Sequence, residues 1–171
     1  MEIEIIKFIQ SFRCNALDLI MWLFSFFASY IAIILMFALF LIVFGKKRAI
    51  FFCLCAVFNV LLNYILKTII NRPRPYELDN LVINSMQALG KSFPSGHMVC
   101  ASTISVFFII FFKTKCKTKL QKFLLYFCVA SYLFCVALSR MYFGQHYISD
   151  LIFGTILGNI LSLVQYYLYK A

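Results

Sequence analysis

Long apolar runs separated by short polar stretches dominate the chain. A helix that crosses a bilayer needs about 20 consecutive apolar residues, and five runs approach or exceed that length. The first is long for one span, so we expect it to bend between Ser25 and Tyr30 or to lie partly in the interface. A division there would raise the count to six. The runs are Leu19 to Phe44, Ala49 to Ile70, Met98 to Phe112, Phe123 to Leu138 and Tyr147 to Tyr167, of which the third and fourth are short unless flanking residues extend them.

The first residues, "MEIEIIKFIQSFR", alternate acidic and apolar positions. They lack the basic start and small-residue cleavage site of a removable signal peptide and instead favour an amphipathic helix lying at the membrane surface. No linker, internal repeat or low-complexity tract divides residues 1–171. The pattern therefore predicts an all-α fold: a single membrane-embedded domain, formed by a polytopic bundle of five or six transmembrane helices plus an N-terminal amphipathic helix.

Composition supports an integral membrane protein. Hydrophobic residues make up 64% of the chain and charged residues 13%, whereas the apolar share of a soluble domain is nearer half. The seven cysteines form no CxxC pair and no Cys/His metal spacing, so neither a disulfide framework nor a zinc site is indicated.

The charges are divided between the two sides of the predicted bundle. Residues 46–48, the loop "KTKCKTKLQK" and Lys170 share one side and carry nine bases and no acid, while all six acids lie on the other side. The positive-inside rule makes the lysine-rich side cytoplasmic. Topology thus accounts for the net charge of +10, and we expect no nucleic-acid partner. No feature indicates an oligomeric state.

The ends of four predicted spans bring polar side chains to the other, outer face. A lone base at a helix end ordinarily snorkels into the headgroups, and a lone histidine there ordinarily caps the helix or lies in the interface. Here four bases, two histidines and an acid gather together, which favours a functional site. They are Lys67, Arg72, Arg74, His97, Arg140, His146 and Asp150.

The stretch Pro94-Ser95-Gly96-His97 directly precedes the third apolar run. Proline suits the first turn of a helix, glycine allows an oxygen to approach the backbone, and serine adds a hydroxyl. Unpaired backbone N–H groups and the positive end of the helix dipole bind phosphate at such a terminus. The stretch therefore predicts a phosphate cradle.

His146 and Asp150 are four residues apart, so on a helix they share a face. A carboxylate that accepts the N–H of one imidazole nitrogen fixes the tautomer and makes the other nitrogen more nucleophilic. His97, from a different helix, is then suited to give a proton to the leaving group.

Three motifs in this order resemble those of the type 2 phosphatidic acid phosphatase superfamily: Lys67 with Arg74-Pro75, residues 94–97, and Ser139-Arg140 with His146 and Asp150. The resemblance implies that His146 attacks phosphorus to form a phosphohistidine, that Asp150 orients it, and that His97 protonates the leaving group and then activates water. It implies no metal and no cofactor. The phosphate-binding residues that it implies are Lys67, Arg74, Ser95, Gly96 and Arg140.

A site on the outer face, ringed by lipid, favours an amphiphile whose phosphate lies at headgroup level. The candidates are undecaprenyl pyrophosphate, phosphatidylglycerophosphate, phosphatidate and lipid A 1-phosphate. A phosphotransferase that passes the same phosphoryl group to an alcohol is the alternative, whereas a non-catalytic lipid-binding protein would not be expected to keep both His146 and Asp150. The short chain suits a bacterial enzyme of the cytoplasmic (inner) membrane, with its site facing the periplasm or the cell exterior.

The loop from Tyr76 to Phe93 is expected to lie over this site. Its segment "LVINSMQAL" predicts a short interfacial helix, with Glu77 and Asp79 near the mouth. Arg72 and Lys91 are candidate substrate contacts that would attract a second phosphate, which slightly favours a pyrophosphate. The residues expected to face lipid are Leu81, Val82, Met86 and Leu89.

Overall fold

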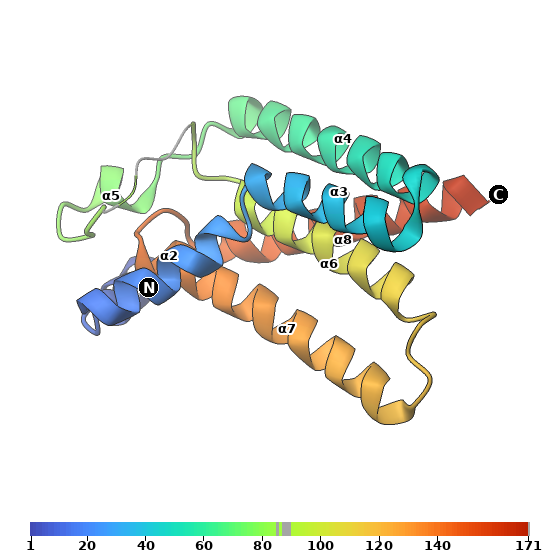
Figure 1. Ribbon diagram of the computed structural model, residues 1–171. Helices are drawn as coiled ribbons and strands as arrows, with labels where there is room; N and C mark the ends of the chain where they lie inside the picture. Colours follow the sequence, from blue (N-terminus) through green and yellow to red (C-terminus); the bar gives the residue numbers. More distant parts are fainter. Residues whose placement is uncertain (85, 87–89, 171) are drawn as a thin grey trace.

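The protein is a bundle of helices (Figure 1). The computed structural model describes residues 1–84, 86 and 90–170, and the regular structure of these residues is entirely helical. The predicted all-α class is confirmed. The helices are α1 (Glu2–Gln10), α2 (Asn15–Phe26), α3 (Tyr30–Phe44), α4 (Lys46–Ile70), α5 (Pro75–Leu78), α6 (Gly96–Phe112), α7 (Lys119–Tyr142) and α8 (Ile148–Lys170).

The apolar helices coincide with the predicted spans. Three segments are long and apolar enough to cross a membrane: α7, α8 and Lys46–Leu78, which contains α4. The pair α2 and α3 meets the same criterion as one span with a bend of 59°. This confirms the predicted break, where the Ser29 side chain accepts a hydrogen bond from Ile31 N–H and caps α3. The fifth segment, α6, has 17 residues.

Helix α6 lies at the centre of the bundle and packs against α3, α4, α7 and α8. Glycines on α8 let the two backbones approach closely. A Cβ atom at Gly154 would lie 2.8 Å from the carbonyl oxygen of Ser95, and one at Gly158 would lie 2.8 Å from the Cβ of Ser102. This contact fixes the beginning of α6 against the beginning of α8, where the Ser95 N–H donates to the Asp150 carbonyl at 3.2 Å.

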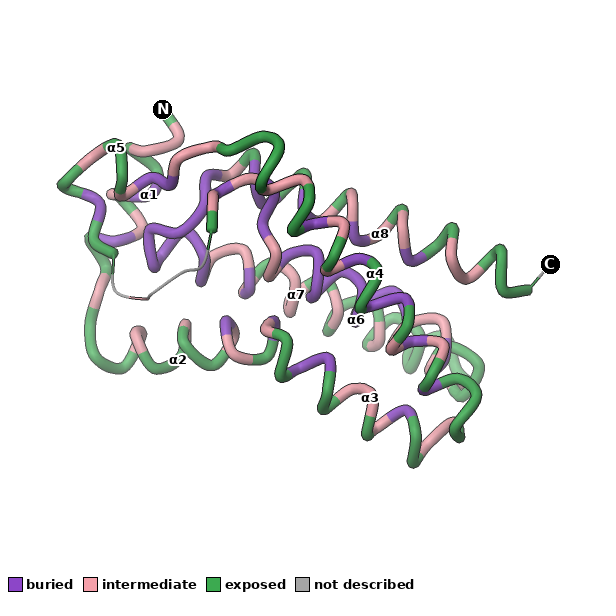
Figure 2. Tube along the Cα trace, turned by 90° about the horizontal axis from the view of Figure 1, so that it is seen from above, coloured by how far each residue is buried: buried purple, intermediate pink, exposed green. Residues whose placement is uncertain are grey.

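An aromatic cluster joins α3, α4 and α6 nearer the lysine-rich end. The ring of Phe40 is 4.9 Å from that of Phe52 and 5.1 Å from that of Phe111, both edge to face. Buried edge-to-face pairs add about 1 kcal/mol each to the burial of their area. Figure 2 shows that buried residues follow α6 and gather at the end that holds α1 and α5, while the outer faces of the other helices are exposed.

The predicted amphipathic helix is present as α1, and one of its faces packs on the protein. Ile6 is completely buried, while Ile5 and Phe8 on the other face are exposed. The buried Gln10 amide exchanges two hydrogen bonds with the backbone of Ile83, of 2.8 and 2.9 Å. It also donates to the Tyr142 carbonyl at 3.0 Å. Helix α1 is therefore anchored to the loop before α6 and to the end of α7.

The interfacial helix predicted over residues 81–89 is wrong for its described part. Residues 81–84 and 86 are not helical, and the short helix of this loop is α5 instead. Val82, expected to face lipid, is 3% exposed because it packs in the core below α1, where Gln10 occupies the backbone hydrogen bonds of Ile83. Leu81 is exposed, whereas Leu89 lies outside the described residues.

The acids of this loop are paired with lysines. Lys7 Nζ lies 2.7 Å from Asp79 Oδ2, and this hydrogen bond lowers the pKa of the Asp79 carboxyl. Lys91 Nζ lies 3.7 Å from Glu77 Oε2. The first pair joins the loop to α1, and the second joins the two ends of the loop to each other.

Candidate active site

A cavity of about 240 Å³ lies where α6 begins. The bend between α2 and α3 contributes Ser29 and Tyr30 to its wall, and Met86 contributes from the loop before α6. Six residues singled out in the sequence line it, from four different parts of the chain: Lys67, Arg74, Gly96, His97, Arg140 and His146.

The beginning of α6 forms one wall of the cavity. Ser95 is the N-cap residue, and its buried hydroxyl accepts from Met98 N–H at 3.5 Å. Gly96 follows it and lines the cavity, and a Cβ there would lie 3.1 Å from Nδ2 of Asn63. Because Gly96 has no Cβ, an anion in the cavity can approach the positive end of the helix dipole closely.

Two cations are held by neutral oxygens of the loop before α6 and of the loop before α8. Lys67 Nζ donates to the Lys91 carbonyl at 2.5 Å. Arg74 Nε donates to the Gly90 carbonyl at 2.9 Å, and its Nη1 donates to the Gln145 backbone and side-chain oxygens, both at 3.0 Å. These acceptors orient the cations without neutralising them, which suits a site that receives an anion.

Arg140 is 2% exposed and supplies a third cation from the end of α7. Its Nη1 donates to the Ser25 hydroxyl, which fixes the guanidinium. Its Nε is buried and has no hydrogen-bond partner among the described residues. A buried donor without an acceptor costs about 1–3 kcal/mol, and a phosphate oxygen in the cavity would supply the acceptor.

His146 and Asp150 face each other as their spacing predicts. His146 Nδ1 lies 3.5 Å from Asp150 Oδ2, with both side chains buried. The same carboxylate oxygen accepts the Tyr147 N–H at 3.0 Å and the Ser92 hydroxyl. Burial and the nearby Arg140 guanidinium lower the pKa of His146 well below its usual range. This direction favours the neutral imidazole that a nucleophile requires.

Comparison with known proteins identifies the family of the chain. The family model described as PAP2 superfamily matches residues 48–171. The chain belongs to the PAP2 superfamily. Its membership confirms the enzyme class expected from the motifs, a lipid phosphate phosphatase of the membrane. No curated protein matches the chain.

Two solved structures share the PAP2 fold. A transmembrane PAP2-type phosphatidylglycerolphosphate phosphatase from Bacillus subtilis is 22% identical, with a TM-score of 0.83 over 99% of this chain and 84% of that one. LpxE from Aquifex aeolicus is 26% identical, with a TM-score of 0.76 over 96% of this chain and 93% of that one. Both likenesses extend beyond residues 48–171, so the fold they share includes the first helices as well.

Four residues that were predicted for the site do not line the cavity. Ser95 is the helix cap, and Asp150 stands behind His146. Lys91 contributes its carbonyl to Lys67 while its ammonium faces Glu77. Arg72, expected near a second phosphate, donates instead to Asp150 Oδ1 at 2.6 Å.

Several supporting residues carried no signal in the sequence. Ser92 and Gln145 are neighbours of motif residues but belong to no charge pattern, and Ser25 and Glu2 lie far from the motifs along the chain. Only the folded chain brings the Ser92 hydroxyl to Asp150, the Gln145 side chain to Arg74 and the Ser25 hydroxyl to Arg140.

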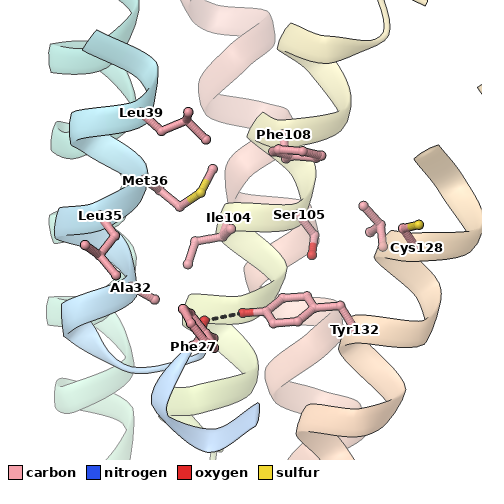
Figure 3. A pocket seen from close by; sticks show the side chains of 11 residues that line it. Phe27, Ala32, Leu35, Met36, Leu39, Ile104, Ser105, Phe108, Cys128 and Tyr132 are labelled. Carbon is pink, nitrogen blue, oxygen red and sulfur yellow. Dashed lines mark hydrogen bonds between the residues drawn. The ribbon is translucent and has the colours of Figure 1, made fainter. Parts of the chain in front are cut away.

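A second, apolar pocket of about 450 Å³ lies between α3, α6 and α7 (Figure 3). Tyr132 crosses its end and donates to the Phe27 carbonyl at 2.6 Å. Cys100 lines the polar cavity and Ile104, one helical turn further along α6, lines this pocket. The bend between α2 and α3 contributes to both. The polar cavity and the apolar pocket are therefore neighbours along one helix.

Proposed function

We propose that this protein is a metal-independent lipid phosphate phosphatase that acts through a phosphohistidine at His146. The observation that carries this proposal is a buried, carboxylate-backed histidine at the wall of a cavity lined by three cations. The cations Lys67, Arg74 and Arg140 supply the charge that stabilises the pentacoordinate phosphorus.

In the first step, Nε2 of His146 attacks phosphorus while its Nδ1 faces Asp150. A P–N bond forms, the bond between phosphorus and the leaving oxygen breaks, and His97 gives its proton to that oxygen. The carboxylate of Asp150 stabilises the positive charge that develops on the imidazole.

In the second step, water replaces the lipid alcohol. His97, now neutral, takes a proton from the water as the water oxygen attacks phosphorus. The P–N bond breaks, orthophosphate leaves, and both histidines regain their starting protonation. If an alcohol attacks instead of water, the same intermediate gives the phosphotransferase reaction.

Phosphate release from purified protein in detergent tests the function. The assay compares undecaprenyl pyrophosphate, phosphatidylglycerophosphate, phosphatidate and lipid A 1-phosphate, each with a chelator present. Hydrolysis of at least one of them in chelator supports the proposal, and no release from any of them contradicts it. An added acceptor alcohol that diverts the product from free phosphate would favour the phosphotransferase. The name of the Bacillus subtilis structure makes phosphatidylglycerophosphate the first substrate to test.

The apolar pocket supports a lipid as the substrate. When the phosphate of a lipid occupies the polar cavity, the hydrocarbon chain of that lipid begins one helical turn from the apolar pocket. Leu35, Ile104 and Phe108 bound this pocket. Burial of an apolar chain contributes about 0.8 kcal/mol per CH₂ group. We therefore assign this pocket to the chain of the substrate.

Leu35→Trp fills this pocket from a partly exposed position on α3. It is expected to raise KM for a long-chain lipid phosphate by roughly three- to tenfold, about 1 kcal/mol. A water-soluble short-chain phosphate does not need the pocket, so its KM is expected to stay the same. Phosphate release measured over a series of chain lengths checks this.

Ile34→Trp is the matched control, because Ile34 is the next residue, is 66% exposed and does not line the pocket. It is expected to leave both KM values unchanged. Equal effects of the two substitutions, or a loss on the short-chain substrate, would contradict the assignment of the pocket.

We further propose that the site faces the periplasm or the cell exterior, in a bacterial cytoplasmic membrane. The lysine-rich loop between α6 and α7 lies at the opposite end of the bundle from α5 (Figure 1). By the positive-inside rule that loop is cytoplasmic.

Cysteine labelling tests this orientation. In intact cells, a membrane-impermeant maleimide is expected to miss a variant whose single cysteine is Cys116, in the lysine-rich loop. It is expected to label Leu81→Cys in a cysteine-free background, because residue 81 is exposed near Asp79. Labelling after permeabilisation controls for reactivity. The reverse pattern in intact cells would place the site in the cytoplasm.

A further inference from the structure

The carboxylate of Asp150 has a second oxygen that faces away from His146. This oxygen, Oδ1, accepts a hydrogen bond of 2.6 Å from Nη1 of Arg72, and the Asp150 side chain has no exposed surface. A buried carboxylate is costly unless a cation compensates it. Arg72 is thus the partner that allows Asp150 to be buried as a charge and that fixes the direction of its carboxylate.

Arg72 is held in turn by three neighbours. Its Nη2 donates to Glu2 Oε2 at 3.2 Å, its Nη1 donates to the Ser149 hydroxyl at 2.8 Å, and its guanidinium carbon lies 4.0 Å from the centre of the Tyr147 ring. A planar guanidinium can bind two carboxylates at once and stack on an aromatic face. Arg72 is therefore fixed between α1 and the beginning of α8.

Glu2 bridges the same two helices. Its other oxygen, Oε1, accepts the Ser149 N–H at 2.8 Å, in the first turn of α8, where the helix dipole favours a negative charge. The far end of α1 is anchored through Gln10 to Ile83 and Tyr142. Both ends of α1 are thus attached to the protein, and the fold sets the place of Glu2.

We propose that Glu2 and Arg72 are positioning residues for the reaction at His146. Glu2, Arg72 and Asp150 form a series of alternating charge, and Asp150 at its end faces the imidazole of His146. This role rests on the proposed function, in which Asp150 orients His146. Glu2 lies outside residues 48–171, the part of the chain that the family model matches.

Neither positioning residue lines the polar cavity. Their loss is therefore expected to change the chemical step, measured as kcat, and to leave phosphate binding as it was. A residue that only stabilised the fold would instead lower the unfolding temperature and the yield of folded enzyme, while kcat for each folded molecule stayed the same.

The test compares Glu2→Gln with Glu4→Gln on the same helix. Glu4 is exposed, pairs with Lys7 and lies outside the series, so it is the matched control. Glu2→Gln is expected to lower kcat on the order of tenfold and Arg72→Gln about a hundredfold, with KM and inhibition by orthophosphate unchanged. Arg72→Lys keeps the charge but lacks the planar guanidinium, so its kcat is expected to lie between those of Glu2→Gln and Arg72→Gln. Each variant is measured by phosphate release and by thermal unfolding in the same detergent.

Glu2→Gln decides the question even if Arg72→Gln does not fold, because Glu2 is partly exposed and glutamine has nearly its shape. A kcat for Glu2→Gln equal to that of Glu4→Gln would overturn this inference alone. So would a rise in KM at unchanged kcat, which would make Glu2 or Arg72 a substrate contact. A parent protein that releases no phosphate from any lipid would overturn the proposed function, and this inference with it.

Discussion

His146→Ala is expected to abolish turnover, with a loss in kcat of about 10⁴-fold or more, while the substrate still binds. The loss is large because the variant lacks the imidazole that forms the covalent intermediate, and removal of a nucleophile has effects of this size. Binding is retained because Lys67, Arg74 and Arg140 are held by groups other than His146. Steady-state phosphate release and equilibrium binding of a lipid phosphate check the two parts separately.

The control for this variant is His146→Gln, which keeps a polar side chain of similar length. Both variants are expected to unfold at temperatures close to that of the parent and to lose the same activity. Appreciable turnover by either variant would show that His146 is not the nucleophile. Loss of substrate binding would show that His146 also contributes to binding of the substrate before reaction.

His97→Ala is expected to have an effect that depends on the leaving group. Lipid alkoxides leave poorly without a proton, so their release is expected to slow by roughly 10² to 10⁴, the usual contribution of a general acid. An activated aryl phosphate leaves without protonation, so its first step is expected to slow by less than about tenfold. Pre-steady-state release of the aryl alcohol, compared with release from a short-chain alkyl phosphate, measures the difference.

Equal losses on both substrates would argue against a general acid at His97. They would fit a residue that only binds phosphate, because phosphate is common to the two. Neither His97→Ala nor His146→Ala is expected to make the activity depend on added metal, since the cations of the cavity are unchanged.

The hydrophobic pattern alone predicts much of the fold. Spans α4 and α8 begin and end within a few residues of their predicted limits because lysines, asparagine and proline bound the apolar runs. Helix α7 is longer than its run because it begins with a capping box at Thr118, which lets Lys119 and Lys122 belong to the helix while their charges reach the surface.

The loop before α6 was predicted less well, for a physical reason. Its apolar spacing fits a helix, yet the buried Gln10 amide donates to the Ile83 carbonyl, an acceptor that such a helix would use, and also accepts the Ile83 N–H. This partner lies 73 residues away in sequence, so no local pattern reveals it. The same holds for Arg72, whose motif suggests a phosphate contact and whose folded neighbours are Glu2 and Asp150.

The motif residues themselves were predictable because their spacing encodes their geometry. His146 lies just before α8 and Asp150 lies in its first turn, so their four-residue spacing still brings them together. Gly96 follows directly from the requirement for an open helix terminus. What the spacing does not encode is the direction of each cation. That direction depends on carbonyls and hydroxyls such as those of Lys91, Gln145 and Ser25, which only the folded chain supplies.

Direct detection of phosphate on His146 tests the central claim. The His97→Ala variant, in which breakdown of the intermediate is expected to be slow, is mixed with an activated aryl phosphate and quenched in alkali, where phosphohistidine is stable. Peptide mass spectrometry is expected to find one phosphoryl group, on His146, that disappears in the variant lacking both histidines. An active enzyme with no phosphate on His146 at any quench time, or with phosphate on another residue, would contradict the account.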